Sequence, residues 1–494
     1  MPVPGARAIS VVGVLLGATL SLSCAPRHAP TAPAVPTVKP VSTSDIEALI
    51  ARGCYRCLEE ALNLSRQRAV SKLAFEAAAL LALRANELGM PGQEWLAQAR
   101  SFASDEASST TYLDMIAAVP SDPLSGQRGD LLVETQARTR ARSMLPMWRE
   151  LLKTDGASSA FRHYLELTLA CSIDVSRERD DDIAKLVGAL PDVPLLRYRA
   201  GICNARLRRD NVAMLTSVRQ DDAGFVDADY PLGKYAMSDP ETPDQEEAMR
   251  LFQLAAVAFP SSAAIAVSIG NLYQSWEEWK NALGAYDTAL ALMPSHPDAL
   301  LGRTISLSNL QQHQEAIATA TRLIEGGQWF LGQAFYWRAW NRYNLGDNAA
   351  ARVDADRTRM LMVNSSVFLL SGLIEWKAPR LPSAETEFEQ SVAMDFGQCL
   401  AALYLGGVRV EQSKVPQAIA ALQQAHQCYD LSIAVHRASI EKINAGRGTP
   451  VTKARSVARE ERLIADDERR REQAIKTGDA LKERQRQPSV QRSR

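Results

Sequence analysis

The feature that most constrains this chain is an alanine that recurs about once every 34 residues. Successive members are separated by 34, 34, 35, 33 and 34 residues. The six members are Ala248, Ala282, Ala316, Ala351, Ala384 and Ala418. Apolar residues accompany them at helical intervals, as in Ala248, Leu251 and Ala255, which indicates a helix with one buried stripe. A unit this short cannot bury its apolar face alone, so neighbouring units must stack. We therefore expect an open-ended, all-α array.

One unit, residues 262–296, shows the pattern most completely. Its Gly270 is followed twelve residues later by Ala282. Tyr286 and Pro294 come next, the first within the second helix and the second at its end. Small residues let two helices cross closely, an aromatic ring fills the remaining gap, and a proline ends the second helix. This pattern resembles the tetratricopeptide repeat, and the resemblance implies an all-α fold of antiparallel helix pairs stacked into an α-solenoid.

The other units keep the period and vary its landmarks. Gly372 and Gly406 occupy the glycine position, whereas Thr304 and Ala339 stand there in two units. These departures leave single boundaries open without removing the period. The predicted segments are a signal peptide at 1–23, a Pro-rich tether at 24–43, a degenerate helical-repeat region at 44–240, the tetratricopeptide array at 241–432, capping helices at 433–485 and a disordered tail at 486–494.

The first residues predict export and lipid attachment. Arg7 is the only charge before a short apolar stretch that ends at Cys24. Residues 20–23 (LSLS) resemble a bacterial lipobox, which implies acyl chains on Cys24; Ser21 stands where that motif most often has Leu. Residues 25–43 hold five prolines and no apolar run, which suits an extended tether. The alternative is an ordinary signal peptide in which Cys24 has no special role.

Two observations concern location. The apolar stretch is short for a membrane span, which needs about 20 strongly apolar residues. Ala25 follows Cys24, and by resemblance to the sorting rules of bacterial lipoproteins the absence of Asp there indicates the outer membrane. We therefore expect a lipid anchor at the periplasmic face of a bacterial membrane, specifically the outer membrane.

The cysteine count supports this compartment. The chain has seven cysteines, and lipid on Cys24 leaves six. An even remainder in an oxidising periplasm suggests disulfides. A redox role for the CYRC motif is the alternative for the first pair, although no βαβ context surrounds it. Proximity pairs the six as Cys54–Cys57, Cys171–Cys203 and Cys399–Cys428.

The sequence carries no signature of a known active site. It contains no HExxH, G-x-S-x-G, Walker A or dinucleotide-binding motif, and its six histidines are dispersed. The run Asp180–Asp182 suggests either a metal site or the start of a helix, where the helix dipole favours acids; we expect the latter. We therefore expect no enzyme activity, no cofactor and no metal.

The charge distribution argues against nucleic acid as a partner. The whole chain has a formal net charge of −1, which excludes a globally basic nucleic-acid binder. From residue 450 onward the chain has thirteen Lys or Arg and eight Asp or Glu, which gives a local net charge of +5. Such an arm could contact anionic lipid headgroups. Its mixed charge favours a solvated capping helix with internal charge pairs.

Solenoids of this kind bind partners along the concave strip formed by their first helices. Tyr336, Trp340 and Tyr343 share one helix face, and large aromatic side chains often dominate binding energy. The alternative role of these aromatics is packing between repeats. Projection of the period places on the strip Asn271, Gln274, Asn309, Tyr336, Trp340, Tyr343, Trp376 and Lys377.

Together these features predict a lipid-anchored periplasmic scaffold that binds other envelope proteins or peptides during assembly or secretion. One alternative is a surface glycan or nutrient receptor, because starch-utilisation lipoproteins also use tetratricopeptide helices. Those receptors insert long aromatic-rich loops, for which the regular spacing leaves little room. A second alternative is an enzyme with a helical appendage, which requires residues 100–240 to form a catalytic α/β domain.

Overall fold

The structure is a computed structural model. The residues it describes are 42–103, 107–119, 131–154, 159–172, 183–185, 187–188, 192–203, 208–238, 244–446 and 449–486. Almost all of them are helical, and none of them lies in a strand. The all-α prediction is therefore confirmed. The predictions for the signal peptide, Cys24, the tether up to residue 41, Asp180–Asp182 and the tail from residue 487 lie outside the described residues.

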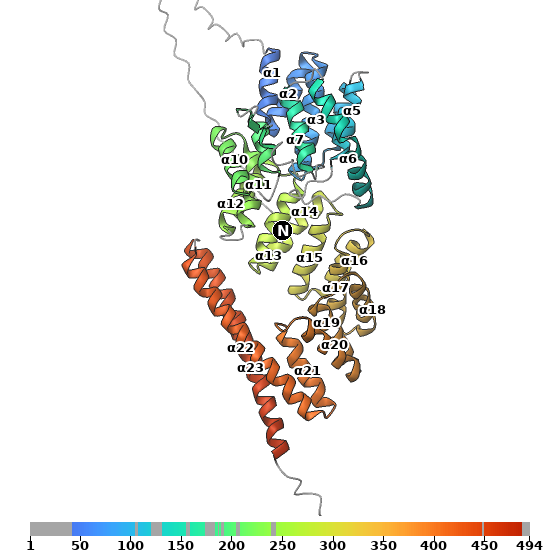
Figure 1. Cartoon of the computed structure of the whole chain (residues 1–494), viewed down its shortest axis with the longest axis vertical. Helices are drawn as coiled ribbons and strands as arrows, with labels where there is room; N and C mark the ends of the chain where they lie inside the picture. Colours follow the sequence, from blue (N-terminus) through green and yellow to red (C-terminus); the bar gives the residue numbers. More distant parts are fainter. Residues whose placement is uncertain are drawn as a thin grey trace, which may run out of the picture. The chain divides into compact units, whose positions relative to one another are not determined.

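Consecutive helices pack side by side along the chain (Figure 1). The region before the array comprises α1 (Thr43–Arg52), α2 (Tyr55–Gln67), α3 (Ser71–Glu87), α4 (Gln93–Phe102), α5 (Ala107–Ala118), α6 (Leu131–Thr154), α7 (Ser159–Ser172), α9 (Pro194–Gly201), α10 (Arg208–Asp221) and the short 3₁₀ turn η2 (Val226–Ala228). The array comprises α11 (Asp229–Met237), α12 (Gln245–Ala258), α13 (Ala263–Ser275), α14 (Trp279–Leu292), α15 (Pro297–Asn309), α16 (His313–Glu325), α17 (Leu331–Asn344), α18 (Asn348–Leu361), α19 (Ser365–Lys377), α20 (Leu381–Met394), α21 (Cys399–Glu411) and α22 (Val415–Ala445). The last helix is α23 (Pro450–Arg486).

The array is held together by rings that lie against glycines. Tyr286 of α14 is fully buried between Gly270 of α13 and Gly302 of α15. A Cβ atom added to Gly270 would lie 2.7 Å from the ring, and one added to Gly302 would lie 2.2 Å from it. Phe388 lies on Gly372 in the same way. Glycine is needed because no other residue leaves room for the ring.

The two units without this glycine have no large ring to accommodate. Thr304 is followed sixteen residues later by Ala320, the same interval that separates Gly270 from Tyr286. Both Thr304 and Ala320 are fully buried. In the next unit Ala339 packs in one cluster with Ala355. A larger residue on one helix is thus offset by a smaller one on the other, which preserves the packing density that protein interiors need.

At both ends of the array, helices extend past the predicted limits of 241 and 432. α11 begins at Asp229 and pairs with α12, where the ring of Phe252 lies against Gly233 as other rings lie on their glycines. At the other end, residue 432 falls inside α22, which continues without a break to Ala445. A helix that merely lengthens leaves the apolar period unchanged, so the repeat pattern could not reveal its end.

A buried ionic network holds the helices before the array together. Arg84 of α3 has no exposed surface, and its guanidinium lies 2.5 Å from Glu87 and 2.5 Å from Asp227 of η2. Its carbon atom Cζ also lies 3.6 Å from the ring centre of Tyr198 of α9. The hydroxyl of Tyr164 of α7 donates to Glu87, and burial raises the pKa of this tyrosine well above its usual range. Buried charges are costly unless paired, so these partners specify how four elements meet.

The described parts of residues 100–240 consist of helices and the loops between them. They contain none of the strands that a catalytic α/β domain would require. Within the described chain, no helix is both long enough and apolar enough to cross a membrane.

Three disulfides join the pairs that were named from the sequence. Sγ atoms are bonded between Cys54 and Cys57, where α2 begins, and between Cys171 and Cys203. The third disulfide joins Cys399, the first residue of α21, to Cys428 in α22. Cys399–Cys428 therefore links consecutive helices of the array, whereas Cys171–Cys203 joins the end of α7 to the residues that follow α9, before the array.

Candidate protein-binding surface

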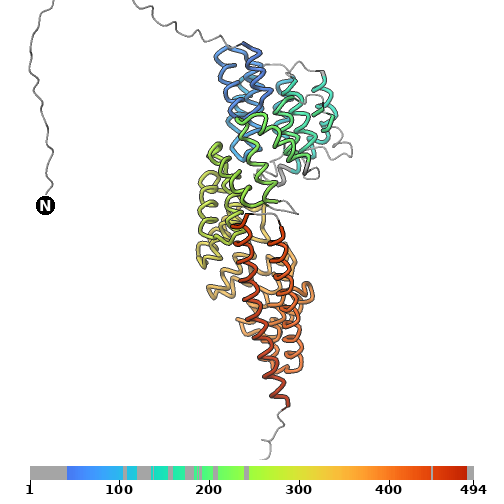
Figure 2. The backbone as a smooth tube through the Cα atoms, turned by 90° about the vertical axis from the view of Figure 1, so that its left-hand side faces the viewer, coloured from blue at the N-terminus to red at the C-terminus, as the bar shows by residue number. Residues whose placement is uncertain are grey.

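The first helix of each pair lies on one side of the array. In Figure 1, α15 and α17 stand to the left of their second helices α16 and α18. α22 and α23 run along that same side, and they cross in front of the array when it is viewed from there in Figure 2. The predicted site residues all belong to these first helices, α13 through α19.

At the start of this surface, two of the predicted residues are engaged within their own repeat. The hydroxyl of Tyr286 lies 2.7 Å from the side-chain oxygen of Asn271 and 3.0 Å from that of Gln274. These amides therefore satisfy the polar end of the buried ring. Asn309, at the end of α15, is exposed, and its amide donates to the carbonyl of Ile305 at 2.9 Å.

The aromatics of α17 are half-buried between repeats. Tyr336, Trp340 and Tyr343 pack against a cluster that includes Leu370 and Ile374 of α19. The ring centres of Trp340 and Tyr343 lie 6.1 Å apart. Burial raises the pKa of both Tyr336 and Tyr343, so each hydroxyl stays neutral at physiological pH. These rings thus contribute to packing between repeats while part of each side chain stays accessible.

A ladder of contacts continues this row across α19 to α21. The ammonium of Lys377 lies 4.6 Å from the ring centre of Tyr343 and donates to its carbonyl at 3.1 Å. Trp376 lies against the backbone of Gly407, and its ring centre is 5.7 Å from that of Tyr404. Its indole N–H donates to Glu411 at 3.0 Å.

Three ladder residues were absent from the sequence prediction. Glu411 stands one period of 34 residues after Lys377, which itself stands 34 after Tyr343, so the period could have located it. One period earlier, Leu373 and Leu370 stand at the positions of Gly407 and Tyr404, so the preceding unit gives no sign of this contact. Only the packing of α19 on α21 shows their role.

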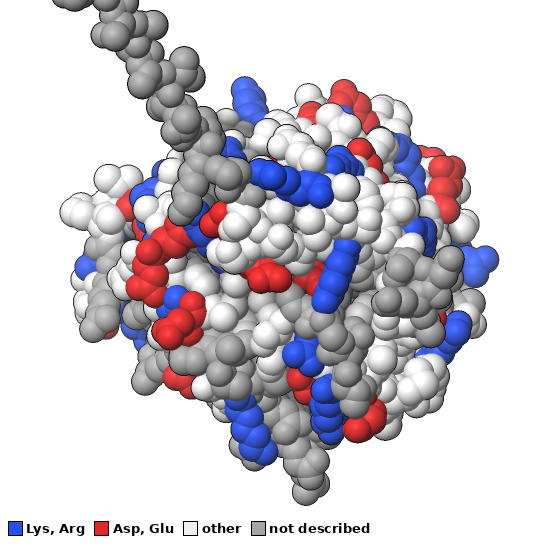
Figure 3. Space-filling model, turned by 90° about the horizontal axis from the view of Figure 1, so that it is seen from above, with Lys and Arg blue, Asp and Glu red and all other residues white. Residues whose placement is uncertain are grey.

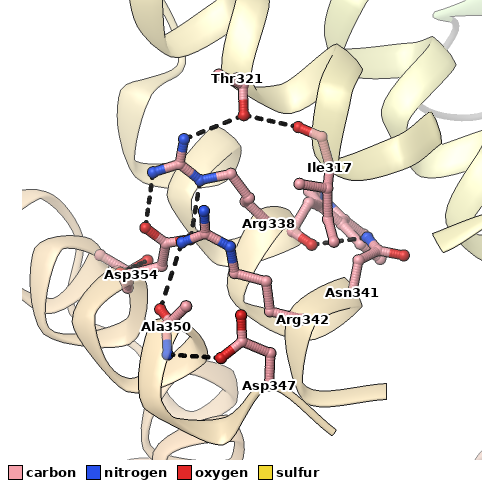
Figure 4. A network of polar contacts seen from close by, with 10 residues as sticks. Ile317, Thr321, Arg338, Asn341, Arg342, Asp347, Ala350 and Asp354 are labelled. Carbon is pink, nitrogen blue, oxygen red and sulfur yellow. Dashed lines mark hydrogen bonds and ion pairs between the residues drawn. The ribbon is translucent and has the colours of Figure 1, made fainter. Parts of the chain in front are cut away.

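A polar network fixes the orientation of α17 (Figure 4). Arg338 donates to Thr321 of α16 at 3.1 Å and to the carboxylate of Asp354 of α18 at 2.8 Å. Arg342 reaches the same carboxylate at 2.7 Å, and Asp354 is 1% exposed. One repeat earlier, Arg303 of α15 also contacts both neighbouring helices, with acid and hydroxyl exchanged: Asp287 of α14 at 2.7 Å and Thr319 of α16 at 2.6 Å. Because α17 is tied to both neighbours, its aromatic face cannot rotate freely.

The surface offers flat rings, amides and paired charges, which suit non-covalent binding. Among the described residues, no group of His, Cys, Asp and Glu side chains is arranged to hold a metal ion. Figure 3 views the molecule from above, onto the end that carries α1 to α7; on that end, basic and acidic side chains are interspersed with uncharged surface. That distribution differs from the basic stripe typical of nucleic-acid binding.

The geometry of the helices from Asp229 onward decides their class. Antiparallel pairs follow a period of about 34 residues, with rings on glycines and buried alanines where helices cross. The array is an α-solenoid of tetratricopeptide-like antiparallel helix pairs. No protein-family model matches the sequence, and no curated protein matches it.

Several solved structures are similar to the chain. YrrB, described as a tetratricopeptide protein with an unusual peptide-binding site, is 22% identical over 36% of this chain and 91% of its own, with a TM-score of 0.31. A tetratricopeptide repeat protein from Parabacteroides merdae is 14% identical over 54% of this chain and 93% of its own, with a TM-score of 0.37. PilW, described as a widely conserved type IV pilus biogenesis factor, is 19% identical over 41% and 93%, with a TM-score of 0.36.

Proposed function

We propose that this protein is a non-enzymatic scaffold that binds other proteins or peptides on the side formed by α13, α15, α17, α19 and α21. In this proposal, acyl chains on Cys24 hold it at the periplasmic face of a bacterial outer membrane. Its partners are envelope proteins that are assembled or secreted there. Tethering raises the local concentration of the solenoid near them, which strengthens binding without a new contact.

The row of half-buried aromatics carries the binding part of this proposal. Trp and Tyr are enriched where binding energy is concentrated, because they bury a large area with few rotatable bonds. In this protein Trp340, Tyr343 and Trp376 are already held by α19 and α21. A side chain that is ordered before the partner arrives loses little conformational entropy on binding.

Site-specific photo-crosslinking in cells tests this proposal. A photoreactive amino acid replaces Asn309, which is exposed on α15 of the proposed surface. The matched control places it at Arg357, which is exposed on α18, a second helix. We expect a defined protein adduct from position 309 and none from position 357. Equal adducts from both positions, or none from 309, would contradict the proposed surface.

A substitution among the aromatics is a less direct test. Trp340 and Tyr343 pack between repeats, so their replacement by Ala removes buried area as well as any partner contact. Loss of the partner in a pull-down would support the proposed surface only if the variant keeps the circular dichroism signal and the unfolding midpoint of the unaltered protein. Asn309 avoids this ambiguity because its side chain is exposed.

A further inference from the structure

The last two helices extend back along the array instead of ending at it. α22 continues well past Cys428, and α23 returns along it in the opposite direction (Figures 1 and 2). The far end of this hairpin reaches the first tetratricopeptide pair. There the hydroxyl of Thr449 donates to the carboxylate of Glu246 of α12. The hairpin therefore spans the same side as the proposed binding surface.

The two halves of the hairpin differ in burial. In the half nearer α21, Ala474 and Leu481 of α23 pack into one core with Cys399, Leu422 and Cys428. In the other half, residues 434–446 and 449–466, no side chain is buried. Few buried contacts mean low local stability, so this half is the part of the hairpin that can be displaced most easily. We refer to it as the strap.

The strap is held together as one unit by polar contacts between its own helices and the adjoining turn of α23. His436 Nδ1 lies 2.7 Å from the carboxylate of Glu460. Arg437 lies 3.1 Å from Glu468. These contacts join α22 to α23. They do not attach the strap to the repeats.

The strap is attached to the repeats by the Thr449–Glu246 hydrogen bond and by three ionic contacts. Arg459 and Arg462 lie 3.1 and 2.9 Å from the carboxylate of Glu277, and Arg455 lies 3.5 Å from Glu278. The three arginines are spaced four and three apart on one face of α23, and the two glutamates follow α13. The guanidinium of Arg455 also lies 4.2 Å from the ring centre of Trp276. We refer to these three Arg–Glu contacts as the latch.

We propose that the strap closes over the binding surface and that release of the latch opens this surface to a partner. The inference rests on the proposed function, whose site it regulates. All five latch side chains are at least one-third exposed. Exposed charges attract one another weakly and are screened by salt, since the Debye length falls from about 8 Å at physiological ionic strength to about 3 Å at 1 M. A partner that competes for these charges therefore has to offset only a small free energy of attraction between the strap and the repeats.

Distance measurement between two spin labels tests the latch without any partner. Cysteines replace Lys280 at the start of α14 and Glu461 of the strap, both exposed, in the full chain carrying Cys24→Ser. We expect one short distance at low salt. Glu277→Gln with Glu278→Gln, or about 1 M NaCl, should add a longer population. The matched control, Glu247→Gln with Glu472→Gln, removes two exposed carboxylates outside the latch and should leave the distance unchanged.

A second measurement asks whether the strap covers the surface. A single cysteine at Asn309, again with Cys24→Ser, is treated with N-ethylmaleimide or with a polyethylene-glycol maleimide. We expect Glu277→Gln with Glu278→Gln to raise the rate with the large reagent several-fold and to leave the small one unchanged. An unaltered label distance in both the double variant and high salt would overturn the latch. A released strap with no change in reagent selectivity would overturn the closure. Neither result depends on the crosslinking test, so failure of the proposed function is seen separately.

Discussion

At the scale of single residues, the array depends on the space that glycines leave for rings. Gly302→Ala would place a Cβ atom 2.2 Å from the ring of Tyr286, which is fixed on its other face by Gly270. Overpacking of this kind costs about 1–3 kcal/mol. Alanine gains roughly 1 kcal/mol of helix propensity over glycine. We therefore expect a net loss in the free energy of unfolding, measured by urea denaturation followed by circular dichroism.

The chain offers a matched control for that substitution one helix away. Gly284 lies in α14, and no atom lies within 4 Å of a Cβ built there. Gly284→Ala should therefore raise the free energy of unfolding by up to about 1 kcal/mol. The prediction is wrong if both variants change stability in the same direction.

The buried charges act at the same scale in the region before the array. Arg84 is surrounded by Glu87, Asp227 and the ring of Tyr198, and none of these is more than slightly exposed. Such a network is weak evidence for net stability, because desolvation offsets much of the attraction. The network nevertheless favours one packing arrangement, since any other arrangement of these helices would leave a charge buried and unpaired.

At the scale of helices, the disulfides should differ in their effect on stability. Cys399–Cys428 closes a segment with a sequence separation of 29, whereas Cys54–Cys57 closes one with a separation of 3. In the chain-entropy description, the longer loop stabilises by about 3.6 kcal/mol and the shorter by about 1.9 kcal/mol. We expect the double Ser variant of the first pair to lower the thermal midpoint more than that of the second. An equal or reversed effect would contradict this account.

The helices also transmit orientation to the proposed surface. Asp354 of α18 binds both Arg338 and Arg342 of α17, and Arg338 also reaches Thr321 of α16. A rotation of α17 would break these contacts together. The aromatic row therefore depends on charged residues on the other side of the helix that carries it.

At the scale of the whole molecule, the proposed anchor and the strap both control access to a partner. The described body begins at Ser42, so a change at Cys24 should leave its folding intact. Cys24→Ser should abolish globomycin-sensitive processing and acylation, so that the chain accumulates as the longer, unprocessed precursor, measured by gel mobility and by incorporation of labelled fatty acid.

The control for this test is the circular dichroism spectrum, which should be the same for the Cys24→Ser variant. A precursor that matures normally without this cysteine would refute the anchor. The proposal of a binding surface on the solenoid would remain, because it concerns residues of a separate segment.

The sequence by itself determined the repeat, its helical class and the residues that face one side of it. These properties are local or periodic: an apolar stripe, a glycine opposite a ring, and an alanine every 34 residues each leave a regular trace in the sequence. The same regularity led to Tyr336, Trp340, Tyr343, Trp376 and Lys377, which do lie in one row of contacts between α17, α19 and α21.

Only the tertiary structure decided what the predicted residues touch and where the last two helices run. Asn271 and Gln274 are held by the hydroxyl of Tyr286, and α22 continues past its repeat to form half of the strap. Arg459 meets Glu277 across 182 residues. Contacts between exposed charges so far apart leave no periodic trace, because many arginines and glutamates could pair equally well until the fold brings two of them together.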